Sequence, residues 1–145
     1  MNNIIVLDGC IDEFKRENEL SIGDNTIFEL FSLAQATKNF DLTFDNLDDS
    51  VVDGGQDGGI DSVLLILDDD YIESIDATED YKFTSSTIFK IIFSQAKTEK
   101  SFKEGSIDKL IASFPVLLEL EQKEEELSRR FNPSLVSKIL ILRQL

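Results

Sequence analysis

The chain has 145 residues, a length typical of one domain, and it carries a net charge of −15. Hydrophobic residues make up 41% of it and aromatic residues 9%, which is a globular rather than a disordered composition. No segment approaches roughly 18 consecutive apolar residues, and no signal peptide is visible, so we expect no membrane span and a cytoplasmic location.

The residue inventory excludes several classes of enzyme. The sequence contains no histidine, so it cannot build a Ser-His-Asp triad, a Cys-His pair or a conventional zinc site. Cys10 is the only cysteine, so no internal disulfide can form. What remains is carboxylate, lysine and oxygen-ligated metal chemistry, which suits Mg²⁺ or Mn²⁺.

Acidic and basic residues are separated along the chain. Residues 41–80 hold 14 acids and no lysine or arginine, whereas residues 81–110 hold six lysines and three acids. The simpler interpretation is that the acids form solvated loops that keep the protein soluble. The alternative is an acidic pocket beside a basic strip, which a metal-dependent phosphodiesterase requires because phosphate contacts need basic residues.

The N-terminal third is predicted to contain two helices and a loop. Apolar residues at helical spacing predict a short helix over residues 6–18. Asp24 is a suitable N-cap for a second helix that ends near Asn39. The apolar positions of this helix are Ile27, Leu30, Phe31 and Ala34. Residues 41–59 are acidic and glycine-rich, and they predict a loop with a short strand at residues 51–52.

Two apolar runs predict the central strands, over residues 60–67 and 88–96. Both are too apolar to face water on two sides, so we expect them to be adjacent strands of one sheet. Between them, residues 68–70 predict a solvated turn, residues 71–75 a short strand and residues 76–86 a loop.

The C-terminal part is predicted to be helical. Ser106 is the expected cap of a helix that Pro115 should kink. Its apolar stripe contains Ile107, Leu110, Ile111, Phe114, Leu117 and Leu118, and we expect the first four of these to pack on the sheet. Residues 121–130 predict a charged, solvated helix, and Pro133 can start another. The apolar end, residues 139–145, would seek a partner if exposed, which leaves open that this is the N-terminal part of a longer protein.

Two polar motifs stand at the ends of the predicted central strands. The segment DGGQDGGID, ending at Asp61, leads into the first strand, and QAK, from Gln95 to Lys97, closes the other. Side chains alternate along a strand, so Gln95 and Lys97 share a face that Asp61 can also reach. Four glycines before Asp61 permit positive φ and a close approach of a nucleic-acid backbone. We therefore expect an acid, an amide oxygen and an amine to converge at one edge of the sheet.

Phosphodiester cleavage uses this set of groups. A carboxylate holds a divalent cation against the phosphate, and the cation acidifies a water and screens the developing charge. A lysine beside it orients the water or stabilises the added negative charge.

The motifs DGGID and QAK together resemble the Mrr-like branch of the PD-(D/E)XK nucleases, in which Gln replaces the second acid. With Phe28-Glu29-Leu30 in the upstream helix, residues 20–115 are also similar to the N-terminal region of AIPR-type abortive phage-resistance proteins. The resemblance implies an α/β fold, with a restriction-endonuclease-like central mixed sheet flanked by helices, in a single domain over residues 1–145.

The resemblance also implies a function and residue roles. Asp61 would hold the metal, Gln95 would take the place of the second acid and Lys97 would be the catalytic lysine. The Ala96 carbonyl would be an extra metal ligand, and Glu29 would match the helical acid that completes such sites. The implied activity is a DNA endonuclease dependent on Mg²⁺ or Mn²⁺, acting in bacterial anti-phage defence by abortive infection. Gln in place of an acid lowers the negative charge at the metal by one unit.

Other interpretations stay open at this point. A DGG turn is common loop chemistry, and Glu29 could simply be exposed to solvent. The spacing of Asp53, Asp57 and Asp61 hints at calcium, but an EF-hand is excluded because its twelfth position is Leu64. The alternative function is a catalytically silent, acidic protein-interaction domain of a larger defence or regulatory protein. The nuclease hypothesis fails if the acid, the amide and the amine do not converge in the fold.

Overall fold

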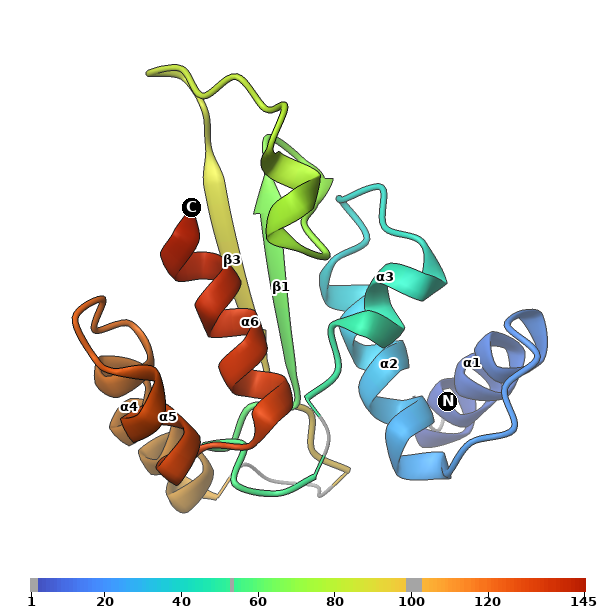
Figure 1. The fold of residues 1–145 in the computed structure, drawn as a ribbon. Coiled ribbons are helices and arrows are strands. Elements are labelled where there is room, and N and C mark those ends of the chain that lie inside the picture. Colours follow the sequence, from blue (N-terminus) through green and yellow to red (C-terminus); the bar gives the residue numbers. More distant parts are fainter. Residues whose placement is uncertain (1–2, 53, 99–102) are drawn as a thin grey trace.

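A computed structural model of the chain describes residues 3–52, 54–98 and 103–145. The secondary structure of these residues consists of six α-helices, three β-strands and one 3₁₀-helix (Figure 1). In chain order they are α1 (Asn3–Glu17), α2 (Asp24–Ala36), α3 (Phe44–Asp49), β1 (Ser62–Leu67), β2 (Asp70–Tyr71), η1 (Ile75–Thr78), β3 (Phe89–Ser94), α4 (Glu104–Leu117), α5 (Glu124–Arg130) and α6 (Pro133–Gln144).

The sheet has the strand order β2-β1-β3, and both pairings are antiparallel. β1 pairs with β3 along its whole length, from Ser62 opposite Ser94 to Leu67 opposite Phe89. The predicted adjacency of the two apolar strands is therefore confirmed. The predicted mixed sheet is wrong for the described residues: the chain turns back after β1 instead of crossing over through a helix, which a parallel pairing would need.

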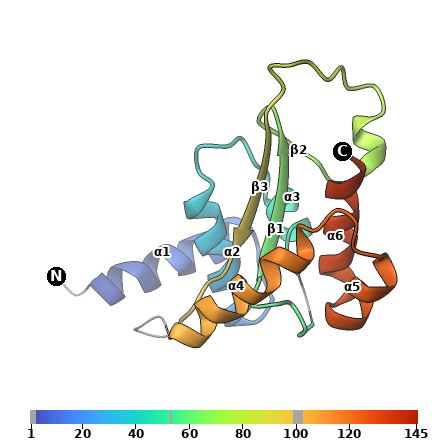
Figure 2. The ribbon, with the colours of Figure 1, turned by 90° about the vertical axis from the view of Figure 1, so that its left-hand side faces the viewer.

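Helices cover both faces of the sheet, which explains why every residue of β1 is buried. Val63, Leu65 and Leu67 point into a core cluster with residues of α4, α5 and α6. Leu64 points to the opposite face, where Leu30 and Leu33 of α2 and Leu47 of α3 complete a second cluster. Figure 2 shows β1 and β3 between α2 on one side and α6 on the other. The coarse prediction of an α/β fold is confirmed.

The acidic turn after β1 is an ordered part of the fold. Asp68 and Asp69 have φ values of 48° and 81°, so both lie in the left-handed region that a tight hairpin turn requires. The Asp68 carboxylate accepts hydrogen bonds from the Ile88 backbone N–H, at 2.7 Å, and from the Tyr81 hydroxyl. The turn was predicted, but its carboxylate holds the returning chain instead of only facing solvent.

Helix boundaries differ from the predicted ones at several points. Gly23, not Asp24, is the N-cap of α2, and Lys103, not Ser106, is the N-cap of α4. The short helix α3 lies where a loop was predicted, and it starts with a capping box formed by Thr43 and Asn46. Six residues are too few for a hydrophobic period to reveal such a helix.

The face that α4 presents to the core was predicted only in part. Leu110 and Phe114 are half-buried against the core, with the Phe114 ring centroid 5.0 Å from that of Phe93. Ile107 and Ile111 are 48% and 63% exposed, so they do not pack on the sheet. Leu117, also on the predicted stripe, is fully buried, because the helix continues through Pro115 to this residue, whereas Leu118 is 44% exposed.

We expect Leu117→Ala to lower the free energy of unfolding by about 2–5 kcal/mol, because it empties a fully buried site. The matched control is Ile111→Ala on the same helix, whose side chain is 63% exposed and should cost below ~0.5 kcal/mol. Urea denaturation followed by circular dichroism measures both. Equal losses for the two variants would contradict the orientation of α4.

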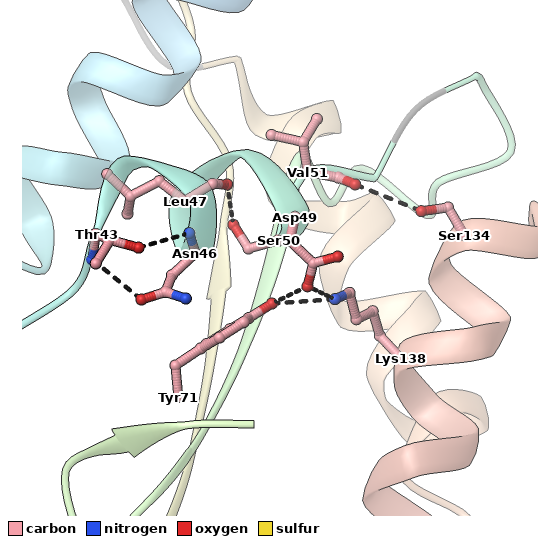
Figure 3. A network of polar contacts seen from close by, with 9 residues as sticks. All are labelled: Thr43, Asn46, Leu47, Asp49, Ser50, Val51, Tyr71, Ser134 and Lys138. Atoms are coloured by element: carbon pink, nitrogen blue, oxygen red, sulfur yellow. Dashed lines mark hydrogen bonds and ion pairs between the residues drawn. The ribbon is translucent and has the colours of Figure 1, made fainter. Parts of the chain in front are cut away.

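A buried lysine joins α6 to α3 and β2 (Figure 3). The Lys138 side chain is 8% exposed, and its ammonium forms an ion pair with Asp49 and contacts the Tyr71 hydroxyl at 3.0 Å. The Tyr71 hydroxyl also donates to Asp49. Burial opposes the charged form of Asp49, but the hydrogen bonds from Lys138 and Tyr71 outweigh it and lower the pKa of this carboxyl. The network therefore links α6 to α3 beside β2, an edge strand of the sheet.

We expect Asp49→Asn to lower the free energy of unfolding at pH 7 by about 1–3 kcal/mol, because Lys138 stays buried without its counter-charge. Since the folded pKa of Asp49 is lowered, its stabilisation is present above the unfolded pKa of about 4 and is lost as the pH falls further. The difference between wild type and variant should therefore shrink below about pH 4. Urea denaturation at pH 7 and pH 3, with Asp48→Asn as the exposed control, tests this; a pH-independent difference would contradict it.

The apolar C-terminal segment, residues 139–145, forms the second half of α6. Ile139 is fully buried, and Leu140, Ile141 and Leu142 are partly buried against the core. Most of the apolar surface that was expected to seek a partner is therefore used within the chain. Pro133 starts α6 as predicted, after an Asn132 N-cap that accepts a hydrogen bond from the Leu135 N–H. Among the described residues, no helix is long and apolar enough to cross a membrane.

Candidate active site

The antiparallel register of β1 and β3 brings the two polar motifs together. Ser62, the first residue of β1, lies opposite Ser94, the last residue of β3. Asp61 therefore lies beside the QAK segment, and its backbone N–H donates to the Ser94 carbonyl at 2.8 Å. The Ala96 N–H donates to Asp61 Oδ2 at 2.6 Å, which orients the carboxylate at the end of the sheet.

The convergence expected from the sequence is present. Asp61, Gln95 and Lys97 line one pocket of about 360 Å³ at this end of the sheet. The pocket is completed by Asp57, Gly59, Lys103, Gly105, Ser106 and Lys109. Two acids, an amide and three lysines thus line the same space.

Glu29 and Ala96 lie on the other side of Lys97. They line a neighbouring hollow of about 190 Å³, together with Asn25, Phe28, Lys97 and Thr98. Glu29 is half-buried on α2, so it is not simply a solvated helical acid. Lys97 is common to both hollows, so each of the other four predicted site residues lines a hollow that Lys97 also lines. Glu29 does not line the pocket that contains Asp61.

Asp61 is the most perturbed carboxyl of the pocket. Burial raises the pKa of Asp61 above its ordinary value, and the negative charge of Asp57 adds to the rise. The hydrogen bond from Ala96 and the positive charge of Lys97 oppose it. A carboxylate that is half-buried and close to another acid gains most from a nearby cation.

The oxygen donors of the pocket fit a hard divalent cation. Gln95 Oε1 is buried and has no hydrogen-bond donor among the described residues, so a cation would satisfy an acceptor that is otherwise costly to bury. Asp61 supplies a carboxylate, and Ala96, whose N–H donates to that carboxylate, lines the hollow on the other side of Lys97. In the described part of the chain, no group of three or more His, Cys, Asp or Glu could hold a metal ion. A site here would therefore depend on the amide and carbonyl oxygens as well as on carboxylates.

The glycine-rich loop before β1 is held on two sides. Ser113 Oγ on α4 donates to the Gly58 carbonyl at 3.0 Å, and Asn132 Nδ2 donates to the Gly55 carbonyl at 2.9 Å. Gly58 and Gly59 have φ values of 65° and 83°, as the sequence led us to expect of this loop. A Cβ on Gly58 would lie 2.5 Å from Ser113 Oγ, so only glycine fits. Asp53, named in the calcium interpretation, lies outside the described residues.

We expect Gly59→Ala to displace side chains that line the pocket and to lower the stability of the protein. The new Cβ would lie 3.1 Å from Gln95 Nε2 and 3.2 Å from Lys109 Cβ, in a backbone region that costs an alanine roughly 1–2 kcal/mol. Thermal denaturation should show that loss of stability. The control Gly9→Ala has open space around it in α1 and should be neutral or slightly stabilising. A Gly59→Ala protein as stable as wild type would show that the loop is loosely held.

Three charged residues of the pocket were not assigned to this site from the sequence, although Asp57 was named in the calcium interpretation. Asp57 comes from the glycine-rich loop, where its Oδ1 accepts the Gly59 N–H at 2.7 Å. Lys103 and Lys109 come from the start of α4. The basic strip over residues 81–110 was the signal for the lysines, but it did not say which of them approach the pocket.

Comparison with known proteins adds no relative from which a role could be transferred, so the assignment of the pocket depends on its own geometry. The chain matches no family model, no curated protein and no solved structure.

Proposed function

We propose that this domain is a metal-dependent DNA endonuclease with a restriction-endonuclease-like fold, which hydrolyses phosphodiester bonds. The observation that carries the proposal is that Asp61, Gln95 and Lys97, which lie just outside the adjacent ends of two antiparallel strands, line one pocket. Two further lysines on the rim of that pocket provide the positive charge that a phosphate needs.

Each residue has a defined task in this proposal. Asp61, Gln95 Oε1 and the Ala96 carbonyl would hold Mg²⁺ or Mn²⁺, with Glu29 as an additional acid on the far side of Lys97. A bound cation would lower the pKa of a water molecule and screen charge on the phosphate. The Lys97 ammonium stabilises the negative charge that the phosphate gains when water attacks phosphorus and the ester oxygen leaves. Asp57 offsets the charge lost through Gln at position 95, because it faces the same pocket.

The biological setting follows from the resemblance of the two motifs. We propose a cytoplasmic role in abortive anti-phage defence, which is compatible with the exposed, free thiol of Cys10. A nuclease that destroys DNA inside the cell is a suitable effector for such a response.

Plasmid cleavage tests the activity directly. Supercoiled plasmid is incubated with the purified chain in Mg²⁺, in Mn²⁺ and in EDTA, and the products are separated on agarose. We expect nicked and linear DNA with either metal and none with EDTA. Lys97→Ala, purified in the same way, excludes a contaminating nuclease. Intact plasmid under all metal conditions, or equal cleavage in EDTA, would refute the proposal.

A second candidate is a catalytically silent interaction domain, favoured by the start of α1. Ile5, Val6 and Leu7 are 68%, 48% and 41% exposed there, and no residue of α1 is buried. Such an apolar helix end on an acidic domain is typical of a contact surface. The plasmid assay separates the two candidates, because an interaction domain leaves the DNA intact with every metal.

A further inference from the structure

The active-site pocket has a neighbour on the other side of the glycine-rich loop. This second pocket, of about 330 Å³, is lined by Gln56, Asp57, Gly58, Gly59, Lys109, Ala112, Ser113, Arg130 and Phe131. It shares Asp57, Gly59 and Lys109 with the pocket of Asp61 and Lys97. The two pockets therefore adjoin across Gly59 and Lys109. Figure 1 shows this loop passing below the ends of β1 and β3, next to α4 and α5.

Cationic side chains line both of the adjoining pockets. Lys97 lines the first pocket, Lys109 lines both, and Arg130 lines the second. In the described part of the chain, none of these three residues forms an ion pair with a carboxylate. Asp57 is the acid that faces both pockets. In a chain of net charge −15, this line of cations is where a polyanion can be held.

The ridge between the pockets is backbone held in place. The Gly58 carbonyl accepts from Ser113 on α4, at 3.0 Å, and the Gln56 carbonyl accepts from the Asn132 N–H at 3.0 Å. The space that a Cβ would need is already filled, by Ser113 and Phe131 beside Gly58 and by Gln95 and Lys109 beside Gly59, so the loop is packed tightly between the two pockets. Ser113 lies on α4, which also carries Lys109, and Asn132, the N-cap of α6, lies two residues after Arg130, the last residue of α5. The loop is therefore anchored close to both cations.

We propose that a DNA strand crosses the Gly58–Gly59 ridge, with one phosphate in the pocket of Lys97 and an adjacent phosphate bound by Arg130 in the second pocket. Lys109 lies between them and contacts the connecting backbone. The proposal rests on the function proposed above, and it adds the path of the substrate and a phosphate-binding role for Arg130. Because the contacts are to phosphates, they position the strand and carry no sequence information.

A binding assay with matched arginine variants tests this path. The probe is a fluorescein-labelled 20-nucleotide single-stranded DNA, followed by anisotropy in Ca²⁺ over a series of salt concentrations. Arg130→Gln and Lys109→Gln should each weaken binding about tenfold or less at low salt and reduce the salt slope by roughly one. The control is Arg129→Gln, which removes the neighbouring exposed charge at the same end of α5 but lines neither pocket. It should bind within about twofold of wild type, because Arg129 lines neither pocket. Any effect of charge on the helix dipole is the same for both arginines, so it does not distinguish the two variants.

The outcomes separate this proposal from the proposed function. If wild type cleaves plasmid but Arg130→Gln and Arg129→Gln bind DNA equally well, the path is refuted and the nuclease function stands. If wild type neither binds nor cleaves DNA, both proposals are refuted. If Arg130→Gln and Lys109→Gln lose affinity and salt dependence while Arg129→Gln does not, the path is supported, whether or not cleavage occurs. Melting curves of the variants, expected to match wild type because Arg129 and Arg130 are exposed, exclude unfolding as the cause.

Discussion

Lys97→Ala is expected to reduce the rate of DNA cleavage by about a hundred- to thousand-fold while leaving the fold intact. Lys97 lines both hollows around the QAK segment, and its charge acts on the Asp61 carboxyl. Loss of one pre-aligned electrostatic donor costs roughly 2.7–4 kcal/mol of barrier, which corresponds to that loss of rate. The side chain is exposed at the end of β3, so its removal leaves no cavity in the core.

The measurement is single-turnover cleavage of a labelled duplex, with thermal melting recorded in parallel. Lys82→Ala is the matched control, because it removes an exposed lysine that precedes β3 instead of following it. We expect the control to cleave within about twofold of wild type, as a surface charge far from the reaction should. A Lys97→Ala protein with the wild-type rate would show that the pocket is structural and would favour the interaction domain.

Asp61→Asn is expected to abolish cleavage at ordinary Mg²⁺ concentrations, and raised Mn²⁺ should restore part of it. The variant removes the charge of the proposed main metal ligand but keeps an oxygen that can accept the Ala96 N–H, which lies 2.6 Å from Asp61 Oδ2. Asp61→Ala would also leave that N–H unpaired, at a cost of about 1–3 kcal/mol. Asn is therefore the variant that separates metal binding from stability.

Rescue by metal distinguishes the two predicted roles. Cleavage by Asp61→Asn should rise with Mn²⁺ concentration, because the lost ligand weakens binding of the cation and mass action compensates. Lys97→Ala should stay slow at every concentration, because its defect is in charge stabilisation. Asp80→Asn, which removes an exposed acid in the loop after η1, serves as the control and should behave as wild type. Equal metal dependence of Asp61→Asn and wild type would show that Asp61 is not a ligand.

Some features of this protein could be read directly from the sequence. The apolar runs that became β1 and β3 were recognisable because a strand buried on both faces needs an apolar residue at nearly every position. Their polar ends were equally clear, since Asp61 and the QAK segment stand immediately outside the runs. Once the two strands pair antiparallel, the start of one must lie at the end of the other, and the convergence of Asp61, Gln95 and Lys97 follows. The expected metal, substrate and endonuclease activity remain predictions.

Other features were decided only by tertiary contacts. The sequence did not give the direction of the strand pairing. It also did not show which residues of the predicted stripe stay exposed, such as Ile107 and Ile111, because that depends on where the sheet lies relative to α4. Lys109 and Arg130 line the same pocket as Asp57, although they lie on helices 52 and 73 residues further along the chain. Sequence alone determined which segments are strands and which polar groups stand at their ends, because alternation and apolar runs are local properties. The tertiary structure decided which cations share the pocket and which helix faces are buried, because charge and burial at a position depend on neighbours that are distant in sequence.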